Sequence, residues 1–260
     1  MAGDMDTVLT WIGRSEQQSE YLAAFPSNAL AATFNRTDPA YHSGSILPPL
    51  WHWLHFLPIS PLEEAGDDGH PRRGGFLPPV PLPRRMWAGS RLEFARPLVL
   101  GTEVKRVSTI RHVEQKSGRS GVLVFVTVHH AISDGQGLAI SEEHDIVYRE
   151  AAQPGAAGPA TVSAPMDPDW ERAVVPDPVL LFRYSALTFN SHRIHYDIEY
   201  VTQVERYPGL VVHGPLIATL LLDGLRRKWP EAIVKTFSFR AIAPIFHTDT
   251  FFLCGRREPD

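Results

Sequence analysis

The chain has 260 residues, enough to bury the core of one large domain or two small ones. Its net charge of −4 and its lack of a basic run argue against nucleic-acid binding. A single cysteine, Cys254, excludes an intramolecular disulfide and a cysteine-built zinc site. The sequence shows neither a signal peptide nor an apolar stretch of membrane-spanning length. We therefore expect a protein of the cytoplasm, or of the mitochondrial matrix if the source is eukaryotic, without a membrane partner.

The first part of the chain is predicted to be helix followed by loop. Residues 19–36 place apolar side chains at helical spacing, with a break or restart at Pro26 and Ser27 as a cap. Residues 46–57 (ILPPLWHWLHFL) are very apolar and predict a buried helix that Pro48 and Pro49 open. Residues 58–86 mix Gly, Pro, Asp and Arg without a period and predict a long loop.

The arginines of this loop, Arg72, Arg73, Arg84 and Arg85, have two interpretations. They could bind the phosphates of CoA or the surface of a partner, or they could simply be solvated. The sequence leaves both open.

Four runs with the composition of strands follow, at residues 87–94, 103–114, 121–132 and 138–148. The third contains VLVFVTVHHAI and is rich in β-branched residues, which favour strands. Residues 116–121 are typical of a hairpin turn. These runs predict an antiparallel sheet.

The second part of the chain repeats this order of helix and strand more briefly. Residues 151–168 are small residues and prolines and predict a linker. Residues 179–188 are strand-like, residues 209–229 form the strongest helix pattern of the chain, and residues 234–245 and 251–253 predict further strands.

The element order predicts an α+β double hot-dog fold, two units in which a curled antiparallel sheet wraps a long central helix. Residues 1–150 would form an N-terminal non-catalytic unit, residues 151–168 a linker, and residues 169–260 the catalytic unit. The strand-forming sequence after the second helix is much shorter than after the first, so we expect the second unit to be incomplete, as in a truncated chain.

Residues 184–197, YSALTFNSHRIHYD, carry the clearest motif. They resemble the signature of the MaoC-like, R-specific enoyl-CoA hydratases, an aromatic and a small residue followed by Asp-x-Asn-Pro-(Ile/Leu/Val)-His. The family's aspartate falls at Asn190, its asparagine at His192, its proline at Arg193 and its histidine at His195. The histidine is kept and the aspartate is not.

A second motif, PGLVVHGPLIATLL at residues 208–221, resembles the start of the family's central helix, where a glycine N–H binds the thioester carbonyl. A helix N-terminus offers unpaired N–H groups and a positive dipole end, which suit a developing enolate. With FSFRAIAPIF at residues 237–246, the chain is similar to the double hot-dog branch of mesaconyl-C4-CoA hydratases, itaconyl-CoA hydratases and 3-hydroxyacyl-thioester dehydratases, a branch that also carries asparagine at the position of Asn190.

The resemblance implies a hydro-lyase that adds or removes water across a 2-enoyl thioester, with CoA or an acyl carrier as the thiol and without a metal or redox cofactor. His195 would deprotonate water, Asn190 would hold the water or the His195 ring, and Gly214 would supply the oxyanion N–H. His195 itself or His192 would return the proton to the α-carbon, although a structural role for His192 is the simpler interpretation. His213 would lie at the substrate or only pack at the helix start.

A distal substrate carboxylate would require an arginine, and Arg183, Arg193 and Arg240 are the candidates. The expected partners are the acyl thioester and, as one available assembly, a second copy in a homodimer. No nucleic acid is expected.

Two alternatives stay open on sequence grounds. His129-His130-Ala-Ile-Ser-Asp134-Gly135 matches the HHxxxDG pattern of CoA-dependent acyltransferases, although it ends a strand and its last residues are typical of a hairpin turn. A non-catalytic hot-dog module that binds acyl thioesters is the other alternative, since the motif lacks the family's aspartate.

Overall fold

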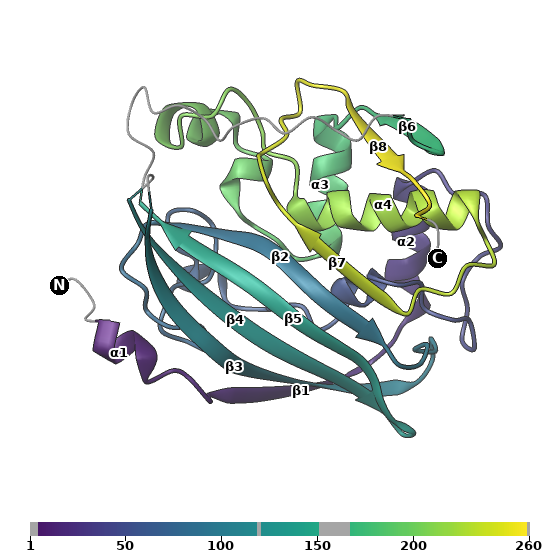
Figure 1. Ribbon diagram of the computed structural model, residues 1–260, viewed down its shortest axis with the longest axis horizontal. Coiled ribbons are helices and arrows are strands. Elements are labelled where there is room, and N and C mark those ends of the chain that lie inside the picture. Colours follow the sequence, from purple (N-terminus) through teal and green to yellow (C-terminus); the bar gives the residue numbers. More distant parts are fainter. Residues whose placement is uncertain (1–4, 119–120, 151–166, 259–260) are drawn as a thin grey trace.

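A six-stranded antiparallel sheet dominates the molecule (Figure 1). The computed structural model describes residues 5–118, 121–150 and 167–258, so most of the linker predicted at 151–168 and the tip of the hairpin predicted at 116–121 lie outside the described residues. The strand order is β1-β3-β4-β5-β2-β7. The bounds are β1 (Ser15–Tyr21), β2 (Arg84–Phe94), β3 (Glu103–Gly118), β4 (Gly121–Asp134), β5 (Gly137–Arg149) and β7 (Thr236–Arg240).

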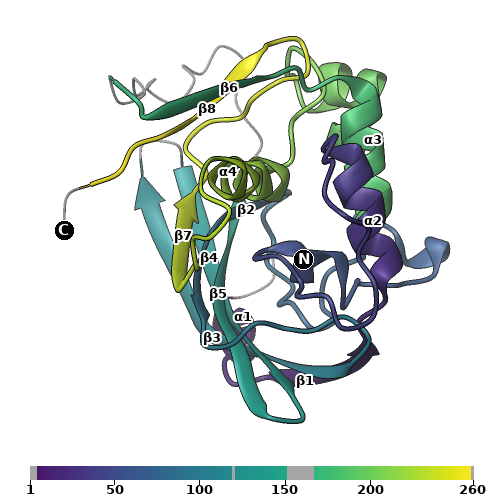
Figure 2. The same ribbon diagram turned by 90° about the vertical axis from the view of Figure 1, so that its right-hand side faces the viewer.

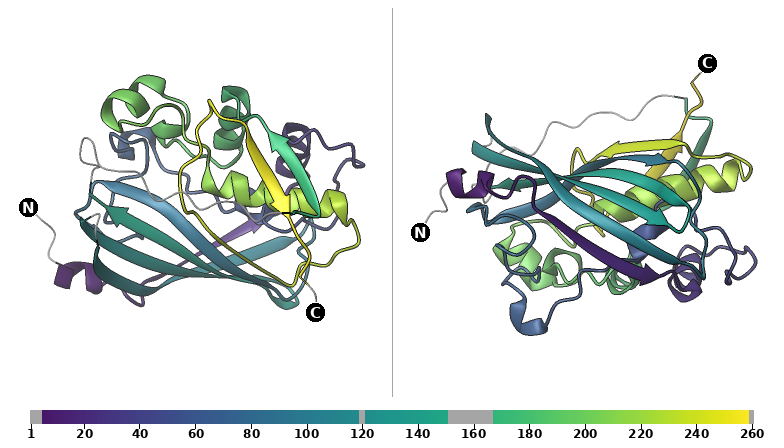
Figure 3. Two further views of the ribbon diagram at one scale, coloured as in Figure 1. Left: turned by 45° about the horizontal axis from the view of Figure 1, so that its top comes forward. Right: turned by 90° about the horizontal axis from the view of Figure 1, so that it is seen from below.

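The four predicted strands correspond to β2, β3, β4 and β5, each somewhat longer than predicted. Their long, twisted ribbons form one curled surface, which is clearest from below (Figure 3). The twist follows from the right-handed preference of L-residues in extended backbone. Val124, Val126 and Val128 of β4 are buried on one face of this sheet, as the alternation of the sequence requires.

The second part of the chain joins this sheet and also covers it. Strand β7 pairs with β2 from Gly89–Arg240 to Glu93–Thr236, so a strand of residues 169–260 extends the sheet of residues 1–150. Strands β6 (Trp170–Val174) and β8 (Phe251–Gly255) pair with each other separately. Helix α4 (Gly214–Lys228) lies between these two groups of strands when viewed end-on (Figure 2).

The α+β class is confirmed, but three predicted elements differ from the structure. Residues 179–188 form a helix, α3 (Pro178–Leu187), and not a strand. The Asp177 side chain accepts from the Leu180 N–H at 2.8 Å and Pro178 occupies the first turn, a combination that starts helices. The helix predicted at 19–36 is shorter: its first residues belong to β1, and α2 (Ala24–Thr33) carries Pro26 in its first turn, where no N–H is missed.

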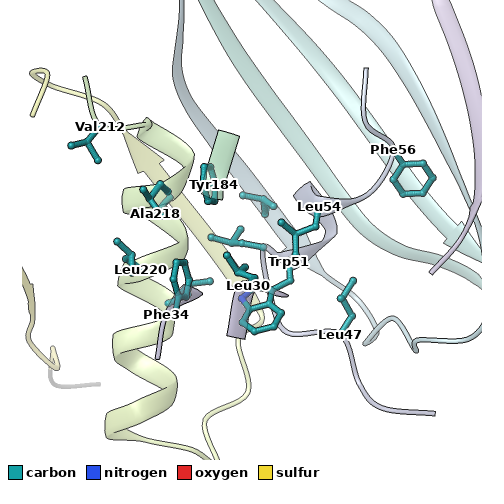
Figure 4. Packing of buried hydrophobic residues seen from close by; sticks show 14 of the residues in the cluster. Leu30, Phe34, Leu47, Trp51, Leu54, Phe56, Tyr184, Val212, Ala218 and Leu220 are labelled. Atoms are coloured by element: carbon teal, nitrogen blue, oxygen red, sulfur yellow. The ribbon is translucent and has the colours of Figure 1, made fainter. Parts of the chain in front are cut away.

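The predicted helix at residues 46–57 is also wrong. This segment contains only the short 3-10 helix η1 (Trp51–Leu54), entered through Leu50 in the left-handed conformation. It is buried as expected, because Trp51 and Leu54 pack toward α2, α3 and α4 (Figure 4). The loop predicted at 58–86 is confirmed apart from the 3-10 helix η2 (Leu62–Glu64) and the start of β2.

The strongest predicted helix is confirmed with a later start. Residues 209–213 are not helical, and α4 begins at Gly214. Helices α2 and α3 pack against each other beside it (Figure 2). The other short elements are α1 (Met5–Leu9), the 3-10 helix η3 (Arg193–His195) and the π-helix η4 (Tyr200–Val204).

A buried carboxylate ties α4 to its neighbours. Asp223 of α4 is 1% exposed and forms ion pairs with three arginines, Arg36, Arg172 and Arg227. These come from the segment after α2, from β6 and from α4 itself. No helix in the described ranges has the length and apolarity to cross a membrane.

Candidate active site

A cavity of about 2960 Å³ lies where the two parts of the chain meet. Its wall includes residues of the sheet such as His130 and Glu142, residues of the loop after α3 such as His195, and the first turns of α4, including Gly214. The two motifs that the sequence singled out therefore face the same space.

His195 ends η3 and is 7% exposed. Its Nδ1 lies 2.7 Å from the carbonyl oxygen of Val211. Because a carbonyl can only accept, Nδ1 carries the proton and Nε2 keeps its lone pair. Burial lowers the pKa of His195 to about 4, against the Val211 hydrogen bond, which raises it. The ring is therefore a neutral base of fixed tautomer at neutral pH.

The His195 ring is stacked on His213, with centroids 3.6 Å apart and planes 18° from parallel. His213 is 1% exposed, precedes the first residue of α4, and its Nε2 lies 2.8 Å from Ser185 Oγ. Burial holds the pKa of His213 well below its usual value. His213 is therefore held between the start of α4 and α3, and it supports one face of the His195 ring.

Gly214 begins α4 and borders the cavity. The next residue, Pro215, has no N–H, and the first N–H groups of a helix have no partner within it. A Cβ at Gly214 would meet no atom within 4 Å, so packing does not demand a glycine. The missing side chain leaves the helix N-terminus open to a ligand.

Asn190 reaches the cavity wall, and its Oδ1 accepts from the backbone N–H of His192 at 3.0 Å. This bond caps the turn that carries the motif. Its amide NH₂ is left for a water or a substrate.

The structure separates the three arginine candidates. Arg240, at the end of β7, borders the cavity. Arg193 is outside the cavity wall, and its guanidinium is 2.7 Å from Asp197 and stacks over Tyr200. Arg183 is exposed on α3 and is also outside the wall.

Sequence reasoning missed a group from the loop before β2. Asp68 Oδ2 lies 3.2 Å from His70 Nδ1, and Asp68 Oδ1 accepts from the His70 N–H at 2.9 Å. The His70 ring lies 4.0 Å from the His192 ring, which lies 5.5 Å from the His195 ring. Four histidines thus form a continuous series from His70 to His213. The segment Asp-Asp-Gly-His at 67–70 falls within the predicted loop, and nothing local in the sequence marks its position beside the motif.

Donor atoms of Asp68, His70 and His192 lie within 4.8 Å of one another, a spacing that a divalent cation could bridge. Both oxygens of Asp68 are, however, engaged by His70. The group is therefore a hydrogen-bonded carboxylate–imidazole pair and not an open set of metal ligands.

The sheet side of the cavity carries a buried carboxylate that the sequence did not predict as functional. Glu142 of β5 is 3% exposed and is hydrogen-bonded to His52, Trp53 and Ser90. Burial alone would raise the pKa of Glu142, but the hydrogen bond and charge of His52 outweigh it and lower the pKa to about 2. Its oxygens are fully used, which makes it a fixed part of the wall.

The HHAISDG segment is a hairpin. Asp134 ends β4, Gly137 begins β5, and the Asp134 carboxylate is ion-paired with Arg96 at 2.8 Å. His130 faces the cavity with its Nδ1 2.9 Å from Ser108 Oγ, whereas His129 is hydrogen-bonded to Ser141. The expected hairpin turn is confirmed.

The fold and the two motifs define a hydro-lyase of the hot-dog type that acts on acyl thioesters. Comparisons agree with this class. The family model "Hydroxyacyl-thioester dehydratase type 2" matches residues 50–247, and the chain belongs to that family.

The chain is 50% identical over 255 residues to a mesaconyl-C(4)-CoA hydratase of Chloroflexus aurantiacus, covering 97% of this chain and 90% of that protein. Among solved structures it resembles a MaoC-like dehydratase of Phytophthora capsici, with a TM-score of 0.64 and 17% identity over 96% of this chain and 87% of that one. It also resembles a Mycobacterium tuberculosis protein with a double hot-dog fold, with a TM-score of 0.58 and 15% identity over 93% and 82%. The predicted double hot-dog class is thereby confirmed.

Proposed function

We propose that the chain hydrates a small, carboxylate-bearing 2-enoyl-CoA such as mesaconyl-C4-CoA, or catalyses the reverse dehydration, with His195 as the base. One observation carries the site assignment: the hydrogen bond to the Val211 carbonyl leaves His195 a single basic nitrogen, in the cavity that also receives the start of α4. The choice of acyl group is supported by the half-identical Chloroflexus aurantiacus hydratase.

The reaction begins with the thioester carbonyl at the N-terminus of α4. The Gly214 N–H and the positive end of the helix stabilise negative charge on the oxygen as C3 is attacked. His195 Nε2 takes a proton from the attacking water, and His213, stacked on His195, keeps the ring from tilting away. The Asn190 amide lies in the same wall and orients the water.

Of the three arginines considered for the substrate's carboxylate, Arg240 is the one that borders the cavity, whereas Arg183 and Arg193 do not. We further propose the division into an N-terminal unit (1–150), a linker (151–168) and a C-terminal catalytic unit (169–260), an assembly as a homodimer, and a location in the cytoplasm.

The test follows the loss of absorbance of the conjugated thioester with mesaconyl-C4-CoA and with crotonyl-CoA. Wild type and His130→Gln are expected to hydrate, and His195→Gln is expected to lose activity. Loss in His130→Gln alone, with acyl transfer to an acceptor, would support an acyltransferase instead. A wild-type protein that binds these thioesters without turnover would be a binding module.

Arg240→Gln tests the substrate. It is expected to raise KM for mesaconyl-C4-CoA more than for crotonyl-CoA, because only mesaconyl-C4-CoA has a carboxylate that can pair with Arg240. An equal effect on both would assign Arg240 to the CoA portion.

A further inference from the structure

The loop at residues 67–70 is fastened to the motif loop of the other half. The Arg193 N–H donates to the Asp68 carbonyl at 2.9 Å, the Arg193 guanidinium donates to the Asp67 carbonyl at 3.0 Å, and Ser191 Oγ donates to the Gly69 carbonyl at 2.5 Å. Gly69 has φ +87°, and a Cβ there would lie 1.9 Å from the Ser191 carbonyl oxygen. Only glycine allows this approach. The backbone therefore sets His70 against His192.

Within this contact, the Asp68 carboxylate defines the state of the His70 ring. It accepts from His70 Nδ1–H at 3.2 Å, which leaves His70 Nε2 able to bind and release a proton. The His70 and His192 rings are 4.0 Å apart at 39°, and the His192 and His195 rings are 5.5 Å apart and nearly perpendicular. His70 and His192 both border the cavity.

The surrounding charges restrict how many protons this group holds. Burial lowers the pKa of His70, the hydrogen bond that His70 donates to Asp68 raises it, and the guanidinium groups of Arg85 and Arg73 lower it. Burial, together with the charges of His70, His195 and Arg85, lowers the pKa of His192 to about 2, against the carboxylate of Asp68, which raises it. Each charged ring disfavours charge on the next, so the array holds one extra proton at most, and Asp68 favours His70 as its place.

Hydration needs two proton transfers, and one fixed base accounts for one of them. Water must lose a proton as its oxygen bonds to C3, and C2 must gain one as the thioester carbonyl re-forms. If two groups each perform one of these proton transfers, no single imidazole ring has to move between C2 and C3.

We propose that Asp68, His70 and His192 form a second acid–base group, with Asp68 as a positioning residue, that delivers the proton to C2 while His195 accepts the proton of water. This rests on the proposed function. The C2=C3 electron pair moves toward the thioester oxygen as the C3–O bond forms, and it returns to form the C2–H bond with the proton that the group gives up. His195 ends with one extra proton and the group with one fewer, and a proton passed back from His195 to His192 restores both. Dehydration runs the same steps in reverse.

The test is the pH dependence of kcat/KM for Asp68→Asn. An acid must be protonated to act, so activity falls as pH rises through the pKa of the group. Removing the carboxylate lowers that pKa, so the alkaline limb is expected to move to lower pH and kcat to fall about 10²-fold, with KM little changed. Asp134→Asn removes a carboxylate that is ion-paired on a turn away from this group and is expected to change neither.

Two further variants separate chemistry from folding. Gly69→Ala retains every acid–base group but forces the two loops apart, so it is expected to lose kcat in the same way. Asp68→Glu is expected to recover part of the rate and the alkaline limb with a native urea midpoint, whereas Gly69→Ala is expected to lower the midpoint because its Cβ would lie 1.9 Å from the Ser191 carbonyl oxygen.

An alkaline limb that stays in place in Asp68→Asn, with wild-type kcat, would overturn the second acid–base group and leave the proposed function standing. Activity that EDTA removes and zinc restores would overturn it in favour of a metal site. A wild-type protein without hydratase activity would instead overturn the proposed function.

Discussion

Replacing His195 by glutamine is the perturbation that examines the site most directly. Glutamine fills a similar volume and offers an amide N–H toward the Val211 carbonyl, but it has no useful proton affinity. A positioned general base contributes about 10²- to 10⁴-fold, which corresponds to about 3–5 kcal/mol of barrier. We therefore expect kcat to fall by that range while KM changes little, because His195 acts on the water.

The loss of stability in the same variant is expected to be small. If the amide does not reach Val211, one hydrogen bond is lost, at a cost of about 1 kcal/mol. Urea unfolding measures this independently of activity. A variant that is as stable as wild type and hydrates mesaconyl-C4-CoA within threefold of its rate would refute His195 as the base.

The pH profile gives a second readout for the same residue. The base must be neutral, so activity is present above the folded-state pKa and is lost as pH falls through it. Since burial lowers the pKa of His195 to about 4, the acid limb of kcat/KM is expected near that pH and not near 6.5. An acid limb between pH 6 and 7 would show that His195 is solvated or is not the base.

Three further predictions concern the frame of the site. Gly214→Ala should fold normally, because its Cβ meets no atom within 4 Å, and yet lower kcat/KM about 10- to 100-fold as the methyl group displaces the thioester; a native circular dichroism spectrum with full activity would contradict this. The folded state lowers the pKa values of His195 and His213, so both rings stay neutral when folded but take up protons below about pH 6.5 when unfolded. The free energy of unfolding therefore falls with pH, and urea titrations at pH 7 and 5.5 should differ by about 2–3 kcal/mol from this pair. Equal urea midpoints at the two pH values would contradict this. Asp223→Asn leaves the arginines around it without their carboxylate and should cost about 3–5 kcal/mol in urea unfolding, whereas a loss under 1 kcal/mol would contradict a structural role.

The sequence was informative where local chemistry determines structure. The β-branched content of residues 121–132 predicted β4, and the apolar pattern of residues 209–229 predicted α4, although α4 begins later, at Gly214. The apolar content of residues 179–188 predicts a strand, whereas the Asp177-Pro178 start is the signal that decides for α3.

Other features could not be predicted because they depend on contacts between distant segments. Asp68 and His70 lie in a loop without a period, more than a hundred residues before the motif that they meet. The same holds for β7, which pairs with β2 across the two parts of the chain. Local propensity carries no information about such pairings. The glycine at position 69 allows the positive φ that the structure has there, but it does not indicate which segment the loop contacts.

The low pKa values of the histidines also explain why the site is divided between the two halves of the chain. Burial keeps an imidazole neutral at a pH where a solvated imidazole would be protonated. His192 and His195, from residues 169–260, border a cavity whose other walls are the sheet and the loop before β2. The same loop brings Asp68, the carboxylate that raises the pKa of His70 and His192 against that burial. Burial from one side and charge from the other therefore act in opposite directions on neighbouring rings. The first favours a neutral base at His195. The second opposes burial at His70, whose pKa still lies below its usual value, so His70 holds a proton more readily than it would without Asp68.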